Sequence, residues 1–329
     1  MSEKNLVTAI RDSLHDEMAR DDRVLLLGED VGTRGGVFKV SEGFLDEFGE
    51  QRVIDTPLAE SGIVGVAIGM ALHGLIPVAE IEFADFIHPA FDQILSEAAR
   101  MRYRTNGDWG CPMVIRAPCG GGIHGALYHS QSIEAFYAHI PGIKVVMPST
   151  PADAAGMLRS AIRDPDPVLF LEHKKCYRLI KGDVPEDGFT TPIGSADVKR
   201  EGSDLTVVAY GYELHRCLEA AARLAAEEGI EAEVVDVRSL APLDVETILT
   251  SVRKTSRAMV VYEDNRTYGA GAEIAATIAE REMFDLDAPI VRVGGPDIPA
   301  MPYAAALEHY YMDPEPDHLF VRMLELARF

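Results

Sequence analysis

Short apolar runs alternate with helical stretches along the chain, and this alternation limits the fold more than any other feature. The first half carries four such runs: "RVLLLGEDV", "IPVAEIEF", "CPMVIRAP" and "IKVVMPSTPADAAGMLRSAIRD". Apolar runs of this length that end in turn residues are typical of buried parallel strands. In the last run, Thr150 can cap a helix that begins at Pro151. The first half is therefore predicted to form a parallel sheet covered by helices.

The same alternation returns after a break. Between Lys181 and Asp204 the periodicity fails and Gly, Pro and charged residues accumulate, so we take residues 186–203 as a linker. Four more apolar runs follow it: "DLTVVAYG", "EAEVVDVRSL", "RAMVVYED" and "APIVRVGG". They predict a second parallel sheet wrapped by helices. The chain has 329 residues, enough for two α/β domains with cores of their own, which we place at residues 1–185 and 204–329.

The charge balance excludes two classes of partner. Lys and Arg total 31 against 53 Asp and Glu, a formal net charge of −22, so we expect neither nucleic acid nor an anionic membrane as a partner. The four cysteines lack CxxC and metal-ligand spacing, which is typical of reduced thiols in a cytoplasmic protein. The first 22 residues have helical periodicity, so we expect no signal peptide, no anchor and a cytoplasmic location.

Residue Glu60 stands at the start of an apolar segment. Residues 63–72 are apolar on every side, which predicts a helix buried all round, with Gly62, Gly65 and Gly69 spaced to let another backbone or a second subunit come close. Glu60 is then half buried in the first turn, where the helix dipole favours an acid. The helix dipole explains why the charge of this residue is negative, but it does not explain why the residue is buried. A functional carboxylate therefore stays open as the alternative.

A glycine- and histidine-rich loop is the most unusual stretch of the chain. "APCGGGIHGALYHSQSIEAFYAH" places three consecutive glycines before His124, His129 and His139. The glycines lack the context of a phosphate-binding loop, and the histidines lack metal spacing. A solvated loop histidine is the ordinary interpretation. His129 as an acid or base is the alternative, because imidazole is suited to proton transfer near neutral pH.

Aromatic residues cluster in "EIEFADFIHPAFDQI", which contains Phe83, Phe86 and Phe91. An aromatic stripe in the core is the simpler interpretation. A platform on which a flat heterocycle stacks is the sharper one.

Two acids framed by prolines, Asp164 and Asp166, lie in "RDPDPVLFLEH". A solvated turn is the default prediction. Rigid carbonyls with a carboxylate could also hold a hard cation.

Taken together, six ordered stretches resemble one family. They are "LLLGEDVG", "DTPLAESGIVGVAIGMAL", "EIEFADFIHPAFDQI", "GALYHSQSIEAFYAHIPGIKVVMPSTPADA", "LEHKKCYR" and "DVRSLAPLD". The chain resembles, from about Leu6 to its C-terminus, the β subunit of the thiamine diphosphate-dependent 2-oxo acid dehydrogenases. The resemblance implies a transketolase-like pyrimidine-binding domain at residues 1–185 and a transketolase C-terminal-like domain at residues 204–329.

The resemblance also implies roles for five residues. Glu60 would hydrogen-bond a ring nitrogen of the aminopyrimidine and drive it to the imino tautomer, which then removes the thiazolium proton. Phe86 would stack on the pyrimidine, and Leu58 would contact the cofactor through its backbone. Glu82, where some relatives carry Gln, falls among the polar contacts of the cofactor. His129 would be the active-site histidine.

A structural potassium site of the family maps onto the segment with the two acids. The resemblance implies these ligands: backbone oxygens of Met113, Ala161 and Ile162, with Asp164 and Asp166. Some relatives have Asn in place of Asp166.

The family motif for the diphosphate and Mg²⁺, GDG followed by Asn, does not occur in this chain. The resemblance therefore implies an α subunit that holds Mg²⁺, an α2β2 tetramer with thiamine diphosphate at each αβ interface, and a lipoyl-bearing acyltransferase core as a further partner. The acidic tail "YYMDPEPDHLF", with Asp313, Glu315 and Asp317, is the expected contact for a small basic domain of that core.

The substrate is read from two stretches. "GALYHSQS" and "EAFYAHIPGIKVV" resemble branched-chain members, which favours 3-methyl-2-oxobutanoate, while pyruvate and acetoin stay open as alternatives. A noncatalytic docking subunit is the alternative of another class, but a scaffold needs none of Glu60, Phe86 and His129. A free-standing transketolase is disfavoured by the missing diphosphate motif.

Overall fold

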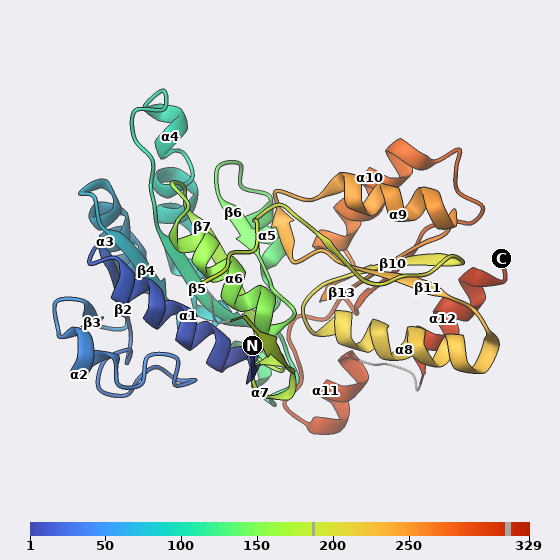
Figure 1. Ribbon diagram of the computed structural model, residues 1–329, viewed down its shortest axis with the longest axis horizontal. Coiled ribbons are helices and arrows are strands. Elements are labelled where there is room, and N and C mark those ends of the chain that lie inside the picture. The colour runs from blue at the N-terminus through green and yellow to red at the C-terminus, as the bar shows by residue number, and fades with distance from the viewer. Residues whose placement is uncertain (186–187, 313–316) are drawn as a thin grey trace. The chain divides into compact units, whose positions relative to one another are not determined.

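The computed structural model describes residues 1–185, 188–312 and 317–329, which fold into two compact units (Figure 1). Unit 1 comprises Met1–Cys119 and Phe136–Ile193, and unit 2 comprises Gly120–Ala135 and Gly194–Phe329. The part of the glycine- and histidine-rich stretch from Gly120 to Ala135, with His124 and His129, thus belongs to unit 2, whereas His139 belongs to unit 1. Of the residues expected in the linker and tail, Glu186, Asp187, Asp313 and Glu315 lie outside the described residues.

Unit 1 is built from the alternation predicted for the first half. Its described strands are β1 (Ser2–Asn5), β2 (Val24–Gly28), β3 (Val53–Asp55), β4 (Ile76–Glu80), β5 (Val114–Cys119), β6 (Lys144–Val146), β7 (Val168–His173) and β8 (Lys181–Val184). Its described helices are α1 (Leu6–Arg20), α2 (Phe44–Phe48), α3 (Glu60–Leu72), η1 (Ala84–Phe86), η2 (His88–Ala90), η3 (Gln93–Ala98), α4 (Met101–Arg104), α6 (Pro151–Ile162) and α7 (Cys176–Leu179), and α5 (Glu134–Ala138) begins at the unit boundary.

The sheet of unit 1 runs in the order β6-β7-β5-β4-β2-β3, and each of these pairs is parallel. Its central strands are buried along their length, as expected for a sheet covered on both faces. Helix α6 begins as predicted, because the Thr150 hydroxyl accepts a hydrogen bond from the backbone N–H of Asp153 and Pro151 occupies the first turn. The predicted parallel sheet is confirmed.

Helix α3 corrects the expectation of burial on every side. Its buried residues face β4, η2 and η3, but Val66 is 53% exposed and Leu72 is 39% exposed. The glycines do not contact another backbone either: a Cβ at Gly69 would meet nothing within 4 Å. Among the described residues of unit 1, the neighbouring elements pack against one side of α3 and leave its apolar outer face uncovered.

Unit 2 repeats the alternation with a smaller sheet. Its described strands are β9 (Asp197–Arg200), β10 (Leu205–Ala209), β11 (Ala232–Asp236), β12 (Ser239–Ala241), β13 (Ala258–Asn265) and β14 (Val291–Gly295). Its described helices are η4 (Ala126–Tyr128), α8 (Tyr212–Glu228), α9 (Val245–Thr255), α10 (Ala270–Glu282), α11 (Ala305–Met312) and α12 (His318–Ala327). Strand β9 falls inside the segment that we expected to be a linker.

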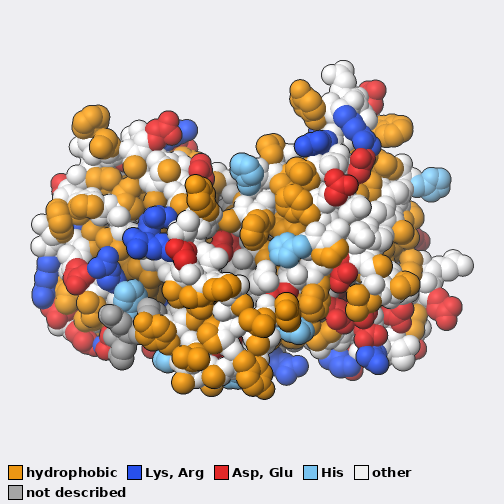
Figure 2. All heavy atoms as spheres, turned by 180° about the vertical axis from the view of Figure 1, so that it is seen from behind, with side chains coloured by type: hydrophobic (Ala, Val, Ile, Leu, Met, Phe, Trp, Pro, Cys, Tyr) orange, Lys and Arg blue, Asp and Glu red, His pale blue; other side chains and the backbone are white. Residues whose placement is uncertain are grey.

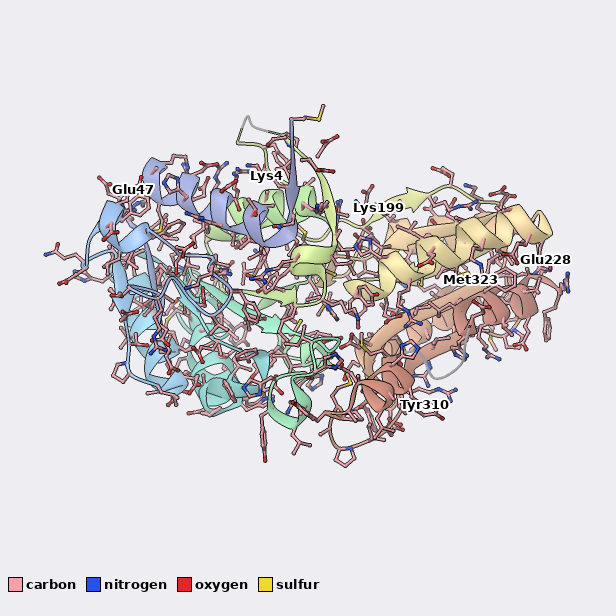
Figure 3. The ribbon with its side chains drawn as sticks, turned by 90° about the horizontal axis from the view of Figure 1, so that it is seen from below. Lys4, Glu47, Lys199, Glu228, Tyr310 and Met323 are labelled. Atoms are coloured by element: carbon pink, nitrogen blue, oxygen red, sulfur yellow. The ribbon has the colours of Figure 1, made fainter. Side chains whose placement is uncertain are left out.

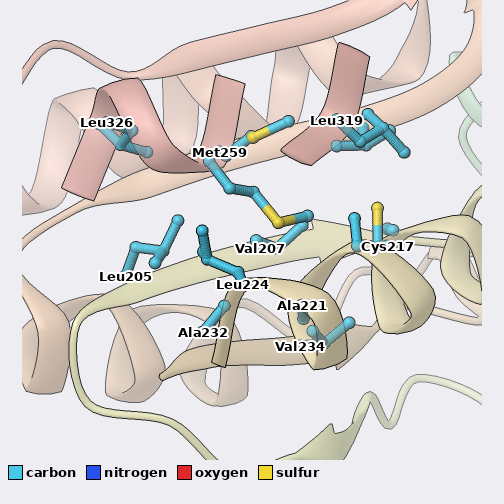
Figure 4. Close-up of a cluster of buried hydrophobic side chains, with 14 of the residues drawn as sticks. Leu205, Val207, Cys217, Ala221, Leu224, Ala232, Val234, Met259, Leu319 and Leu326 are labelled. Atoms are coloured by element: carbon cyan, nitrogen blue, oxygen red, sulfur yellow. The ribbon is translucent and has the colours of Figure 1, made fainter. Parts of the chain in front are cut away.

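The main sheet of unit 2 runs in the order β14-β13-β10-β11-β9. All pairs are parallel except β9, which runs antiparallel to β11. Figure 4 shows the core between this sheet and helices α8 and α12, where Leu205, Val207 and Met259 meet Leu224 and Leu326. Met323 of α12 belongs to the same core (Figure 3). The predicted second parallel sheet is therefore confirmed, with an antiparallel edge strand.

Two further expectations concern the cysteines and the membrane. No disulfide joins the four cysteines, and all four are buried in the described part of the chain. Among the described residues, no helix combines the length and the apolar character needed to cross a membrane.

Candidate active site

Acidic side chains gather at the carboxyl end of the sheet in unit 1. Glu29 and Asp30 follow β2, and Glu82 follows β4, the parallel neighbour of β2. Gly28 pairs with Glu80 in the register of these two strands, so the residues after them leave the sheet at the same edge. Ligands of open parallel sheets bind at this edge.

Mutual repulsion and burial show in the pKa values of these acids. Burial, followed by the charges of Glu29, Asp30, Glu80 and Glu60, raises the pKa of Glu82 to about 7. Burial and the charges of Asp30 and Glu60 also raise the pKa of Glu29. The site therefore concentrates negative charge, and Glu82 holds its proton up to about neutral pH. Such a site suits a ligand that donates hydrogen bonds or carries positive charge.

Glu60 is half-buried and is the first residue of α3, as predicted. Among the described residues, no hydrogen bond or ion pair to its carboxylate is present. The hydroxyl of Thr56, four residues earlier, is also buried without a hydrogen-bond partner in the described chain. A half-buried carboxylate without a partner fits the ring nitrogen of an aminopyrimidine, whose N–H it would accept.

A buried ion network lies directly behind these acids, and the sequence reasoning missed it. The Arg116 guanidinium donates to both Glu172 oxygens at 2.7 and 2.9 Å and to Glu80 Oε2 at 2.5 Å. Tyr177 also donates its hydroxyl to Glu172. The signal was present in the sequence, since β4, β5 and β7 are otherwise apolar strands that carry the charged residues Glu80, Arg116 and Glu172.

The aromatic segment forms short 3₁₀ helices, η1 and η2. Phe86 ends η1, is partly buried, and meets the Phe83 ring edge-on at 5.9 Å between centroids. Phe83 in turn meets Phe38 at 5.6 Å. Leu58 lies in the loop before α3 with 71% of its surface exposed. These residues lie in unit 1 with Glu60 and Glu82, whereas His129 lies in unit 2.

The loop with His129 is folded back on itself in unit 2. Its base is closed by the Gly120 N–H, which donates to the Gln131 carbonyl at 2.9 Å. Gly122, His124 and Ala126 all have positive φ, a backbone conformation that is uncommon for residues other than Gly. His129 follows η4 and is partly buried, so it is not the fully solvated histidine of the ordinary interpretation.

Two carboxylates of the C-terminal segment hold this loop. Glu263 Oε1 accepts hydrogen bonds from the Gly121 N–H at 2.7 Å and from the Ser132 hydroxyl at 3.1 Å. Glu308, a buried residue of α11, accepts from the Gly122 and His124 N–H groups. Its second oxygen lies 2.6 Å from His124 Nδ1. The loop is therefore anchored by long-range contacts that local sequence could not reveal.

A third acid in this region is buried beneath the loop. Tyr210 donates its hydroxyl to Glu134 Oε1 at 2.9 Å. Burial, followed by the charge of Asp264, raises the pKa of Glu134 to about 8. Burial also raises the pKa of Asp264 to about 6. Glu134 thus carries a proton at neutral pH.

The residues expected to bind potassium already have partners in the described chain. Lys144 Nζ lies 2.6 and 2.5 Å from the two Asp164 oxygens, and Arg102 donates to Asp166 at 2.6 Å. The Met113 carbonyl accepts the Val168 N–H. The other expected ligands, Ala161 and Ile162, are buried in the last turn of α6. A potassium ion would therefore have to compete with the Lys144 ammonium and the Arg102 guanidinium for the two carboxylates. The described residues also contain no cluster of three or more His, Cys, Asp or Glu suited to a metal.

Both units match known domain families. Residues 2–180 match the transketolase pyrimidine-binding domain, and residues 194–318 match the transketolase C-terminal domain. The 2-oxoisovalerate dehydrogenase subunit beta of Bacillus subtilis (strain 168) is 57% identical over the full length of both chains. The chain belongs to the family of 2-oxo acid dehydrogenase β subunits. This β subunit is therefore part of an oxidoreductase, and the predicted family and fold class are confirmed.

Pyruvate-type β subunits are also similar to this one. The pyruvate dehydrogenase E1 component subunit beta of Bacillus subtilis (strain 168) is 51% identical over 90% of this chain and 91% of its own. Among solved structures, a chain described as "Split gene transketolase, inactive beta4 tetramer" has a TM-score of 0.78 at 25% identity and covers 98% of both chains. The β subunit thus has the transketolase fold along its length.

Proposed function

We propose that this β subunit, together with an α subunit, decarboxylates 3-methyl-2-oxobutanoate on thiamine diphosphate and passes the acyl group to a lipoyl-bearing acyltransferase. The observation that carries the proposal is Glu60, a half-buried carboxylate without a partner in the described chain, at the edge of a pyrimidine-binding domain. A charge in that position is costly unless something binds it.

The residues of unit 1 would bind and orient the cofactor. Thiamine diphosphate supplies the carbanion chemistry when it is bound. Glu60 would accept a hydrogen bond from the protonated pyrimidine ring nitrogen, and its negative charge would stabilise the imino form of the ring. Phe86 offers its ring for stacking, Leu58 a backbone contact, and Glu82 a neutral carboxyl group that resembles the Gln of some relatives.

His129 would serve the second half-reaction. Opening the lipoyl dithiolane ring requires a proton on one sulfur, and imidazole can donate it near neutral pH. We expect His129→Ala to slow reductive acylation by about 10² to 10⁴ while decarboxylation with an artificial electron acceptor falls far less. An equal loss in both assays would assign His129 to general positioning instead.

An α subunit supplies what this chain lacks. We infer an α2β2 tetramer in which α holds the diphosphate and Mg²⁺, because the chain carries no GDG motif followed by Asn. The outer face of α3 supports a partner, since Val66 and Leu72 are exposed there and Leu58 is exposed in the loop before the helix. Figure 2 shows apolar side chains interspersed with charged ones on the face drawn there.

Three finer points rest on the sequence resemblance. The limits at residues 1–185, 186–203 and 204–329 remain our proposal for the domains. Docking of the acyltransferase core through the acidic tail also remains a proposal, of which Asp317 is described and pairs with Arg223. Potassium binding at Asp164 remains a proposal as well, which thermal unfolding in KCl against NaCl would test.

Pyruvate is the alternative substrate, because a pyruvate-type subunit is 51% identical, and acetoin is the next. The test is co-expression with the neighbouring α-type reading frame and turnover of a panel of 2-oxo acids and acetoin. We expect the highest kcat/KM with 3-methyl-2-oxobutanoate and no turnover by the β subunit alone. A preference for pyruvate would assign the protein to the pyruvate-type enzymes. Activity without an α subunit would overturn the two-subunit proposal. An inactive complex would favour a noncatalytic docking subunit.

A further inference from the structure

The loop that carries His129 reaches Glu308 through its backbone rather than through the histidine itself. Glu308 Oε1 accepts two adjacent loop amides, the Gly122 N–H at 2.9 Å and the His124 N–H at 3.1 Å. Glu308 Oε2 meets His124 Nδ1 at 2.6 Å. Hydrogen bonds from N–H groups to a carboxylate are among the stronger ones in proteins, and this carboxylate is only 2% exposed. The contact is therefore hard for water to replace.

The anchored segment is in direct contact with the backbone of His129. A Cβ placed on Gly125 would lie 2.6 Å from the His129 carbonyl oxygen and 2.8 Å from His129 Cβ. Gly125 follows His124 without a break, so a shift of His124 moves the surface against which His129 packs. The contacts thus run from α11 through His124 and Gly125 to His129.

Both ends of the loop are held as well. Glu263 binds the Gly121 N–H near the start of the loop and the Ser132 hydroxyl near its end. Glu263 thus holds the two ends of the loop, and Glu308 holds the segment between them at Gly122 and His124.

We propose that Glu308 is a positioning residue for acyl transfer, which holds the His129 loop in its reactive conformation through the backbone amides of Gly122 and His124. The inference rests on the proposed function of His129 and assigns a role to a helix distant in sequence. A misplacement of about 1 Å in a reacting group can cost about 10² in rate. Glu308→Ala should therefore slow reductive acylation by about 10- to 100-fold.

Three variants separate positioning from a general loss of structure. Glu308→Gln keeps an oxygen that can accept both amides, so it should retain most of the acyl-transfer rate, whereas Glu308→Ala should not. Leu307→Ala is the matched control, because Leu307 lies on the same helix, is 57% exposed and does not belong to the anchor. The position of this helix can be found in Figure 3 by the label of Tyr310, a residue that is 61% exposed and also lies outside the anchor.

The first readout is amide hydrogen exchange of the full chain, followed by mass spectrometry of peptides that cover residues 120–128. Exchange should rise about tenfold or more in Glu308→Ala and stay at the wild-type level in Leu307→Ala, because a freed amide exchanges with its local opening. Unchanged exchange in Glu308→Ala would overturn the anchor, whatever the role of His129.

The second readout is a double-variant cycle in the αβ complex. If Glu308 acts through His129, the pair His129→Ala with Glu308→Ala should transfer acyl groups no more slowly than His129→Ala alone. A further loss in the double variant would overturn the positioning role, and so would a wild-type rate in Glu308→Ala. If His129→Ala itself keeps full acyl transfer, the proposed function of His129 fails, and hydrogen exchange then still decides whether the anchor exists.

Discussion

At the residue scale, the chemistry depends on which acids carry a charge and which carry a proton. Glu60 has no partner among the described residues, yet it lies beside Glu82, whose pKa is raised to about 7. A neutral Glu82 spares Glu60 one repulsive neighbour. The acidic cluster can therefore present one carboxylate to a bound ring while a second, protonated carboxyl group lies beside it.

Glu60→Gln should leave the fold intact and slow exchange of the thiazolium proton in the αβ complex by about 10² to 10⁴, because a neutral amide cannot supply the charge that stabilises the imino form. Proton exchange followed by NMR measures this rate. Glu50→Gln, a change of the same kind at an exposed site, is the control. Exchange at the wild-type rate in Glu60→Gln would remove this residue from the mechanism.

Glu82→Gln tests the raised pKa. Below pH 4.5, the ordinary value, Glu82 is protonated in both the folded and the unfolded chain. As the pH rises from there to about 7, the unfolded chain releases the proton first, so the folded state loses stability. Glu82→Gln should therefore raise stability above pH 7 by about 1 kcal/mol, allowing for solvent screening. Urea unfolding at pH 5 and pH 8 measures this difference, and an equal effect at both values would contradict the shift.

At the scale of elements, the strands of unit 1 are joined by charges as well as by backbone hydrogen bonds. Arg116 of β5 lies between Glu80 of β4 and Glu172 of β7, and all three are buried. Such a network orders neighbouring strands because each charge depends on the others for compensation. Gly36 also approaches Glu80, since a Cβ there would lie 2.8 Å from Oε1.

Arg116→Met should destabilise unit 1 by about 3 to 5 kcal/mol, because it leaves two carboxylates buried without their cation. Glu80→Gln and Glu172→Gln in the same chain should recover much of the loss. Urea unfolding followed by circular dichroism measures both effects. Arg34→Met, at an exposed ion pair, should change stability by less than about 1 kcal/mol. A loss from Arg116→Met no larger than that control would show that the network does not hold the strands.

At the scale of the whole molecule, helix α3 of unit 1 carries a surface that points to a further chain. The outer face of α3 carries the exposed residues Val66 and Leu72, and the Cβ position of Gly69 on the same helix is open. Small residues on a helix face allow close approach of another helix. We expected α3 to be buried by neighbouring elements or by a second subunit, and within the described chain the neighbouring elements cover one side of it.

Val66→Asp should prevent assembly with the α subunit or a second copy without unfolding the chain, because a charge on the covered face would be buried without a partner. Size-exclusion chromatography with light scattering measures the assembly. Val321→Asp is the matched control on α12, where Val321 is 42% exposed. Normal assembly of Val66→Asp would exclude this face of α3 as an interface.

The sequence by itself determined the elements that depend on near neighbours. The apolar runs became buried parallel strands, Thr150 and Pro151 began α6 as predicted, and Glu60 began α3. These outcomes follow from hydrogen bonds and periodicity within a few residues. The family, too, could be recognised from the sequence, because the resemblance depends only on motifs and their order along the chain.

Only the tertiary structure decided which distant groups meet. Local sequence assigned His124 to a loop, but the carboxylate of Glu308 that binds its backbone lies 184 residues away. Arg116 meets Glu172 across 56 residues, and the all-apolar α3 is covered on one side only. Such contacts depend on how strands and helices pack, which the local sequence pattern does not determine.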